Sequence, residues 1–300
     1  MPKPNTIICE LCGGRGFTVH GDRPVDCQCI RERRKTAAYD AIGIPKHLQK
    51  LNIESFVIKQ DATGDDNKFE IEKRVARSLV YQWCEQVGEC VLTGQQFVLD
   101  PTRAYEAPGG KDNDKPEDAD RKRNANIRQE TWSGSWVILR GGRSSGKSLF
   151  AAVMAKAAAA AGTSPKVIQW AEVVESCYDF DRSSSGLYSR MSIMFERCSP
   201  LIIENVDTAY ERTFSDGTSL TPNTKMRLDV LFGPINADSR PVVFTTSRET
   251  AAISAATNSL GPVLGSILEE AAVIDLPGRT NTFQMTVLNS RGGVKPTANG

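Results

Sequence analysis

The sequence predicts an α/β protein with a parallel sheet covered by helices on both faces, and a small N-terminal module stabilised by metal. Three observations support this prediction. From Trp132 onward, short apolar stretches alternate with stretches of helical character, as parallel sheets require, because each strand is followed by a crossover helix. A glycine-rich turn follows the first of these strands. The first 35 residues hold half of the eight cysteines but too few apolar side chains for a core of their own.

Length and composition limit the number of domains and the classes of partner that this chain can have. The 300 residues suit one core of about 150 to 200 residues with appendages. A net charge of +1 excludes a global basic field, so any contact with nucleic acid must come from local patches. No apolar stretch reaches the length of a membrane span, because Lys156 interrupts the best one, and the N-terminus lacks the apolar region of a secretory signal. We therefore expect a cytoplasmic protein with no membrane partner, whose cysteines are reduced or metal-bound.

The cysteines of the N-terminal module form two close pairs, Cys9 with Cys12 and Cys27 with Cys29. Four thiolates from two tight turns can make one tetrahedral zinc site, and His20 is an alternative ligand. Reduced surface cysteines are the competing interpretation. The remaining cysteines show no ligand spacing and are expected to pack in the apolar interior: Cys84, Cys90, Cys177 and Cys198.

Between this module and the alternating region, the elements are less regular. Residues 36–66 are interpreted as a linker, in which Pro45 opposes helix formation. Apolar residues fall largely on one side between Lys68 and Val87, which predicts a helix. Residues 91–99 are expected to form a short strand or hairpin. Residues 106–130 are nearly free of apolar side chains and predict a mobile insertion.

The alternating region predicts strands and helices in turn. The expected strands cover residues 136–140, 166–171, 201–205, 241–247 and 272–276. The expected helices between them cover residues 147–161, 186–198, 223–237 and 260–271.

The glycine-rich turn, Gly141 to Ser148, matches the phosphate-loop pattern G-x-x-x-x-G-K-[ST]. Glycines let backbone N–H groups surround phosphates at the positive end of the following helix. Lys147 is expected to reach the β- and γ-phosphates of ATP or ADP, and Ser148 to bind Mg²⁺. The predicted nucleotide contacts are Gly141, Gly142, Arg143, Ser144, Ser145, Gly146, Lys147, Ser148 and Leu149.

Two further strands end in polar residues. Glu204 ends an apolar strand, where a carboxylate would face Mg²⁺. Asn205 follows, and an amide cannot take a proton from water, a contribution commonly worth about 10² to 10⁴ in rate. Asp207 is the nearest alternative acid. The strand of residues 241–247 ends in Thr245, Thr246 and Ser247, whose hydroxyls could sense a γ-phosphate; a common strand ending explains them equally well.

In this order, the motifs resemble the DnaC/IstB group of AAA+ ATPases, which includes replicative helicase loaders, their phage counterparts and transposition helpers. The resemblance covers about residues 40–280. The stretches that carry it are residues 43–56, similar to the linker of the group; 141–148, its Walker A loop; 199–207, its Walker B strand; and 228–248, its sensor 1 strand. Some of these loaders also carry a cysteine-rich N-terminal module, with which they engage the helicase.

The chain differs from the group at the positions whose residues hydrolyse ATP. An Asp and a second acid usually end Walker B, where Glu204 and Asn205 stand, and Ser247 replaces the usual sensor 1 Asn. The helix expected at 260–271 has no arginine to act as a finger, a group worth about 10³ to 10⁵ in rate. Arg279 matches a later arginine of the group, and Arg240 and Arg248 are other cations. The resemblance therefore implies slow or conditional hydrolysis.

The resemblance implies a helicase loader of the bacterial or phage-infected cytoplasm. It would use ATP or ADP, Mg²⁺ and Zn²⁺, assemble with like subunits on ATP binding, and deliver a replicative DNA helicase to single-stranded DNA. Tyr178, Phe180 and Arg182 are candidates for the DNA contact, and a solvated loop is the alternative. An IstB-like transposition helper on duplex DNA and a non-hydrolysing nucleotide-binding adaptor remain open. The expected parts are a zinc module (1–35), the linker (36–66), an AAA+ domain (67–290) and a tail (291–300).

Overall fold

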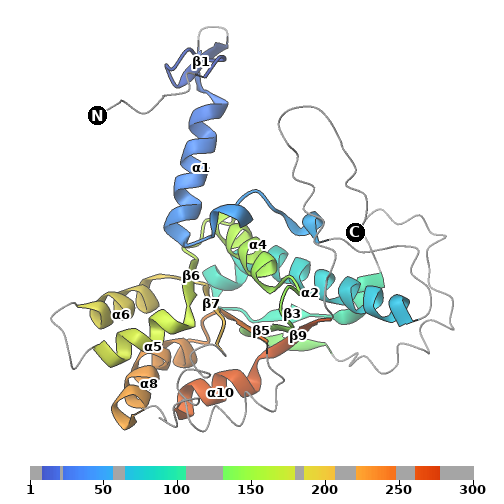
Figure 1. Ribbon diagram of the computed structural model, residues 1–300, viewed down its shortest axis with the longest axis vertical. Coiled ribbons are helices and arrows are strands. Elements are labelled where there is room, and N and C mark those ends of the chain that lie inside the picture. Colours follow the sequence, from blue (N-terminus) through green and yellow to red (C-terminus); the bar gives the residue numbers. More distant parts are fainter. Residues whose placement is uncertain are drawn as a thin grey trace, which may run out of the picture.

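The computed structural model describes residues 9–20, 23–56, 65–105, 131–179, 186–206, 221–247 and 261–277. A five-stranded parallel sheet lies at its centre, in the order β6-β7-β8-β5-β9 (Figure 1). Counted along the chain from β5, this order is 2-3-4-1-5, the strand order of the AAA+ P-loop fold. The predicted fold class is confirmed. The strands are β5 (Trp136–Gly141), β6 (Lys166–Gln169), β7 (Leu201–Glu204), β8 (Val242–Thr246) and β9 (Ala272–Leu276).

One face of the sheet is covered by α2 (Asp65–Thr93) and α4 (Lys147–Ala160) (Figure 1). Successive side chains of a strand point to opposite faces, so Val137 and Leu139 of β5 enter this core. The small side chains of α4 bring its backbone close to the sheet. Four of its alanines are almost completely buried: Ala151, Ala152, Ala155 and Ala158.

The opposite face is covered by four helices: α5 (Trp170–Asp179), α6 (Leu187–Arg197), α8 (Pro222–Ala237) and α10 (Pro262–Glu270) (Figure 1). Trp136 and Ile138 of β5 enter this second core. Phe232 of α8 lies at its centre and meets Phe195 of α6 edge-on, with ring centroids 5.2 Å apart. The two cores hold the sheet from both sides, so its strand ends have fixed positions.

The helix α5 was not expected. Residues 166–171 were predicted as one strand, but β6 ends at Gln169 and α5 begins at Trp170. Buried residues of α5 recur at helical spacing: Trp170, Val173, Val174 and Cys177. The other predicted strands and helices of this region are confirmed, with ends that shift by one residue or two.

The helix α2 is longer than expected and continues through Val91–Thr93, so the predicted strand or hairpin at 91–99 shrinks to β3 (Phe97–Leu99). β3 pairs antiparallel with β4 (Trp132–Gly134) in a separate two-stranded sheet, and η3 (Pro101–Tyr105) follows β3. The Gln86 side chain donates to the carbonyl of Val98 and accepts from its N–H, each at 2.8 Å. Gln82 does the same with Asp100, also at 2.8 Å. Two helix side chains thereby occupy the second edge of β3.

The N-terminal module consists of a hairpin, β1 (Phe17–His20) and β2 (Arg23–Asp26), followed by α1 (Gln28–Ile42). In Figure 1, α1 projects from the body and carries the hairpin at its outer end. Residues 31–38 of α1 are all exposed. The helix α1 includes residues 36–42, which were predicted as part of the linker, so the helical part of the N-terminal module is longer than expected.

The inner end of α1 is fixed on the sheet domain. The helix ends at Gly43, whose φ of 97° is left-handed and whose Cβ, if present, would lie 2.6 Å from the carbonyl oxygen of Val167. Lys166 donates to the carbonyl of Ala41 at 2.7 Å. Two short 3-10 helices, η1 (Lys46–Leu48) and η2 (Ile53–Ser55), then lead along the body toward α2.

Several predictions fall outside the described residues. These are the insertion at 106–130, the tail at 291–300, Asp207, Phe180, Arg182, Arg248, Arg279 and the side chain of His20. Within the described ranges, none of the helices is long and apolar enough to span a bilayer.

Candidate functional site

The phosphate loop connects β5 to α4 and has a tightly constrained backbone. Gly141 faces the end of β9, and a Cβ there would lie 2.5 Å from the carbonyl oxygen of Leu276 and 2.6 Å from Oγ of Ser145. Ser144 and Gly146 have φ values of 65° and 97°, both left-handed. The glycines of the pattern are thus required by close approach and by backbone conformation. The helix α4 begins directly after this loop, and the N-terminus of a helix carries a partial positive charge that favours a bound phosphate.

The positive charge of the site belongs to Lys147, the first residue of α4. Its Nζ donates to the carbonyl oxygens of Gly141 and Gly142, at 2.7 and 2.8 Å, so the ammonium lies within the loop. Arg143 and Ser148 are exposed at the loop surface. Leu149 is 2% exposed and belongs to the first core, so its side chain faces the protein interior.

Glu204 is the end residue of β7 and is 3% exposed. Its Oε2 accepts a hydrogen bond from Nε2 of Gln169 at 2.9 Å. Its Oε1 is buried and has no hydrogen-bond partner among the described residues, and the same holds for Oγ of Ser145. A buried oxygen without a hydrogen bond destabilises the folded protein unless a donor or a metal ion binds to it. Oxygen donors are the ligands that Mg²⁺ prefers, so the residues present fit a bound magnesium ion.

Asn205 is fixed through both its backbone and its side chain. Its φ of 59° is left-handed, a conformation that asparagine tolerates better than most residues. Its backbone N–H donates to Oγ1 of Thr245, and its Nδ2 donates to Oε1 of Gln169, each at 2.9 Å. Gln169 therefore bridges Glu204, the last residue of β7, and Asn205, which follows the strand. Sequence reasoning missed it, although the last residue of a strand beside β7 is the place where such a bridge can form.

The tip of β8 contributes differently from what the sequence predicted. Thr245 and Thr246 are at most 1% exposed, and the hydroxyl of Thr245 is used by Asn205. Ser247 follows the strand and is exposed. On the other side of β5, Arg140 forms an ion pair with Asp275 of β9 through two N–H groups. Arg240 serves the second core, because its guanidinium donates to the carbonyls of Phe195 and Cys198.

The linker packs directly on the phosphate loop. The Phe56 ring lies 4.6 Å from that of Phe150 between centroids, and a Cβ on Gly146 would lie 3.0 Å from it. Lys156 of α4 donates to the carbonyl oxygens of Leu48, at 2.6 Å, and of Leu51. Burial lowers the pKa of Lys156 to about 8. The loop, α4 and the linker are therefore one packed unit.

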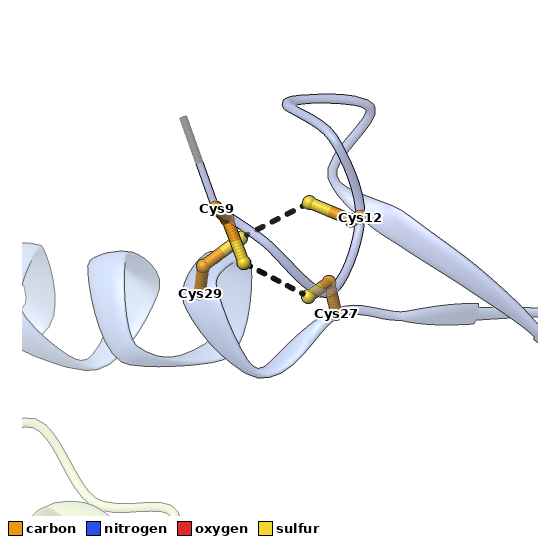
Figure 2. A group of neighbouring side chains, drawn as sticks. All are labelled: Cys9, Cys12, Cys27 and Cys29. Carbon is orange, nitrogen blue, oxygen red and sulfur yellow. Dashed lines mark hydrogen bonds between the residues drawn. The ribbon is translucent and has the colours of Figure 1, made fainter. Parts of the chain in front are cut away.

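The four cysteines of the N-terminal module meet in a single cluster (Figure 2), in which all sulfur atoms lie within 4.8 Å of one another. Cys9 and Cys27 are 3.8 Å apart, and Cys12 and Cys29 are 3.6 Å apart. Zinc–sulfur bonds of about 2.3 Å in a tetrahedron place sulfurs about 3.8 Å apart, so the cluster fits a zinc ion.

The surroundings of the cluster favour at least one thiolate. The backbone N–H of Gly16 donates to the sulfur of Cys12 and lowers the pKa of that thiol to about 6. Desolvation raises the pKa of Cys29 to about 12. The other four cysteines lie apart from this cluster; Cys90 and Cys177 are buried, and Cys84 and Cys198 are half-buried. Burial raises the pKa of each of these four thiols, which agrees with a packing role.

No protein-family model matches the chain, and no curated protein matches it. Among solved structures, the chain is similar to AMPPCP-bound DnaA from Aquifex aeolicus, at 11% identity and a TM-score of 0.46, over 76% of this chain and 50% of that one. It is also similar to the DnaC helicase loader, at 10% identity and a TM-score of 0.42, over 78% of this chain and 100% of that one. It is similar to DnaI as well, at 13% identity and a TM-score of 0.41, over 80% of this chain and 97% of that one.

The chain spans about half the length of the DnaA structures that it matches. The parallel sheet with helices on both faces, and not these superpositions, supports the predicted fold class.

Proposed function

We propose that this chain is an ATP-binding helicase loader of the DnaC/IstB kind, which assembles with a replicative DNA helicase and delivers it to single-stranded DNA. One combination of features supports the proposal. An AAA+ fold with a phosphate loop and a buried strand-end carboxylate is joined to a four-cysteine module on an exposed helix. The sequence resemblance described above, which includes the phosphate loop and the strand that ends at Glu204, supports the same family.

The phosphate loop and Lys147 would hold the triphosphate of ATP, and Ser148 and Glu204 would hold Mg²⁺. The ion would neutralise charge on the phosphate oxygens. Arg279 would also contact the nucleotide, a role that the resemblance alone supports. Ser247, exposed at the end of β8, would sense the γ-phosphate.

Hydrolysis would be slow or conditional. Asn205 supplies hydrogen bonds but takes no proton, and α10 has no arginine to offer a neighbouring subunit. The same two features favour a second function, a nucleotide-binding adaptor that assembles without turnover. A measured rate of ATP hydrolysis separates the two.

The N-terminal module would bind the helicase. Its hairpin and cysteine turn expose apolar side chains, of which Leu11 is 69%, Val19 60% and Phe17 41% exposed. Exposed apolar clusters rimmed by charge are typical of protein-binding sites. The helix α1, which follows the hairpin in the same module, exposes four basic residues: Arg31, Arg33, Arg34 and Lys35.

The test uses the full chain and a purified replicative helicase. Calorimetry with ATP and Mg²⁺ is expected to detect binding to the native protein and at least about 10-fold weaker binding to Lys147→Ala. Co-sedimentation is expected to retain the helicase with the native chain and to lose it with Phe17→Ser plus Val19→Ser. Ile193→Ser is the control, because Ile193 is an exposed residue of α6, outside the N-terminal module. No nucleotide affinity, or helicase retention by the hairpin variant, would overturn the corresponding half of the proposal.

A further inference from the structure

The direction in which α1 projects from the sheet domain depends on contacts at its inner end (Figure 1). Residues 31–38 are all exposed, so the middle of the helix has no packed face that could hold it. At the inner end, Lys166 of β6 donates to the carbonyl of Ala41. A further contact comes from Lys156 of α4, the helix that follows the phosphate loop.

The ammonium group of Lys156 joins three parts of the chain. Its Nζ donates to two carbonyl oxygens of the linker, those of Leu48, at 2.6 Å, and of Leu51. The same Nζ lies 5.5 Å from the centre of the Tyr39 ring in α1, within the range of a cation–π contact. Within the described ranges Lys156 forms no ion pair with an acid, so its charge is held by two carbonyl dipoles and one ring.

A lysine suits this position because its ammonium has three donors, no acceptor and a long stem. Lys156 is half-buried, so its stem packs against the protein while the ammonium reaches the linker. A methionine of similar length would fill the same space but would donate no hydrogen bond. The two carbonyls would lose a charged donor, and hydrogen bonds to charged groups contribute more than neutral ones.

The linker connects this contact with the phosphate loop. After Leu51 the chain continues to Phe56, whose ring lies 4.6 Å from that of Phe150 between centroids and also faces Gly146. Phe150 and Lys156 are six residues apart on α4, which corresponds to about 9 Å along the helix. The linker is therefore attached to α4 at two points, one beside the loop and one beside the base of α1.

We propose that Lys156 is a clamp that fixes the angle of α1 on the sheet domain and transmits movements of the phosphate-loop helix to the N-terminal module. The clamp itself requires no ligand. The transmission rests on the proposed nucleotide-binding function, because the loop must respond to a nucleotide. Without the clamp, Lys166 and Gly43 would still attach α1 to β6, but the helix could tilt about that attachment.

The experiment measures the distance between the N-terminal hairpin and the sheet domain in the full chain. Spin labels are placed at Arg23 and Glu172, both exposed, on non-natural side chains that leave the cysteines unmodified. Double electron–electron resonance then gives the distribution of distances. In Lys156→Met this distribution is expected to be at least about 2-fold broader, since a tilt of about 10° moves the far end of α1 by about 4 Å.

Three further variants show whether the clamp depends on the ammonium and the ring. Lys156→Arg keeps the charge and several donors and is expected to restore most of the native width. Tyr39→Leu removes the ring alone, is expected to broaden the distribution less than Lys156→Met, and decides the question if Lys156→Met does not fold. Lys225→Met is the matched control, because Lys225 is a half-buried lysine of α8, on the other face of the sheet.

ATPγS with Mg²⁺ tests the transmission. Saturation is expected to shift the mean distance in the native chain. Lys156→Met is expected to bind ATPγS with a Kd changed less than about 3-fold, yet to show a smaller shift. The measurement of Kd is needed because it separates a lost connection from a lost ligand.

The outcomes separate the clamp from the proposed function. If calorimetry finds no nucleotide binding to the native chain, the proposed function and the transmission fail, and the widths alone decide the clamp. A native width in both Lys156→Met and Tyr39→Leu would overturn the clamp. The transmission would be overturned by an equal shift in Lys156→Met and the native chain, or by no shift in a native chain that binds ATPγS.

Discussion

Glu204 and Asn205 are neighbours in the sequence, yet they lie in opposite settings. Glu204 is buried, and one of its oxygens has no hydrogen-bond partner in the part of the chain that the structure describes, whereas the amide of Asn205 donates to Gln169. The sequence predicted both residues as site residues, because a carboxylate after an apolar strand is a strong pattern. It could not reveal Gln169, since a glutamine within a short predicted strand has no distinguishing spacing. Its role depends on the sheet placing β6 beside β7, which is a long-range property.

Glu204→Gln tests the magnesium site. The change removes a negative charge but keeps the size of the side chain and an oxygen that Gln169 can bind. We expect the gain in ATP affinity caused by Mg²⁺ to fall at least about 10-fold, the size of one lost contact to a charged group. Calorimetry with ATP, with and without Mg²⁺, measures this gain.

The control for that experiment is Glu172→Gln, the same chemical change at an exposed residue in the first turn of α5. It is expected to behave as the native chain. Undiminished dependence on Mg²⁺ in Glu204→Gln would exclude Glu204 as a ligand of the ion.

At the scale of elements, the sequence predicted the helices and strands with a clear apolar pattern. It missed those whose formation depends on contacts with other parts of the chain. The strands β7 and β8 are continuous apolar runs and were placed within one residue at each end. α5 was missed because Trp170 also suits a strand, so β6 was extended through it. α1 was missed because its middle is polar on every side, and a helix without an apolar face gives no periodic signal. The N-terminal hairpin likewise depends on the cysteine cluster more than on local pattern.

Phe56→Ala tests whether the linker supports the phosphate loop. Phe56 is 3% exposed and touches both α4 and the loop glycine Gly146. Its truncation is expected to lower the free energy of unfolding by about 3 to 5 kcal/mol and to weaken ATP binding, because the loop loses its support. Denaturant unfolding and calorimetry measure the two effects.

Ile193→Ala serves as the comparison, because Ile193 is 47% exposed and its truncation should leave both quantities nearly unchanged. An ATP affinity in Phe56→Ala that equals the native value would show that the loop keeps its shape without the linker.

At the scale of the whole molecule, the buried apolar residues are distributed unequally between the N-terminal module and the sheet domain. Among the described residues, the first core residue along the chain is Ile42, at the inner end of α1, and Tyr39 of the same helix packs against that core, so the cysteine turns and the hairpin have no share in either core. The sequence anticipated this from composition alone, because a cysteine-rich segment with few apolar residues needs a metal to fold. The position of the module at the end of an exposed helix could not be anticipated, since it follows from the packing of Gly43 against Val167.

Metal analysis of the native chain is therefore expected to find about one zinc per molecule. Cys9→Ser should lose it, and chelation should unfold the module while the sheet domain keeps its unfolding temperature, because the two cores do not include the module. Cys198→Ser, at a half-buried cysteine outside the cluster, should retain the metal. A metal-free native protein with an ordered hairpin would contradict the zinc site.

The helix α1 projects from the body, so a small rotation at its base would move its far end by a larger distance. Its 15 residues span about 22 Å, and its inner end is held by contacts to β6, while α4 holds the linker that follows. A rotation of about 10° at that base would carry the far end through about 4 Å, a distance that follows from the same helical rise. A small rotation of α1 on nucleotide binding would thus produce a measurable displacement of the hairpin at its far end. Energy transfer between one fluorophore on the hairpin and another on the sheet domain would report that displacement.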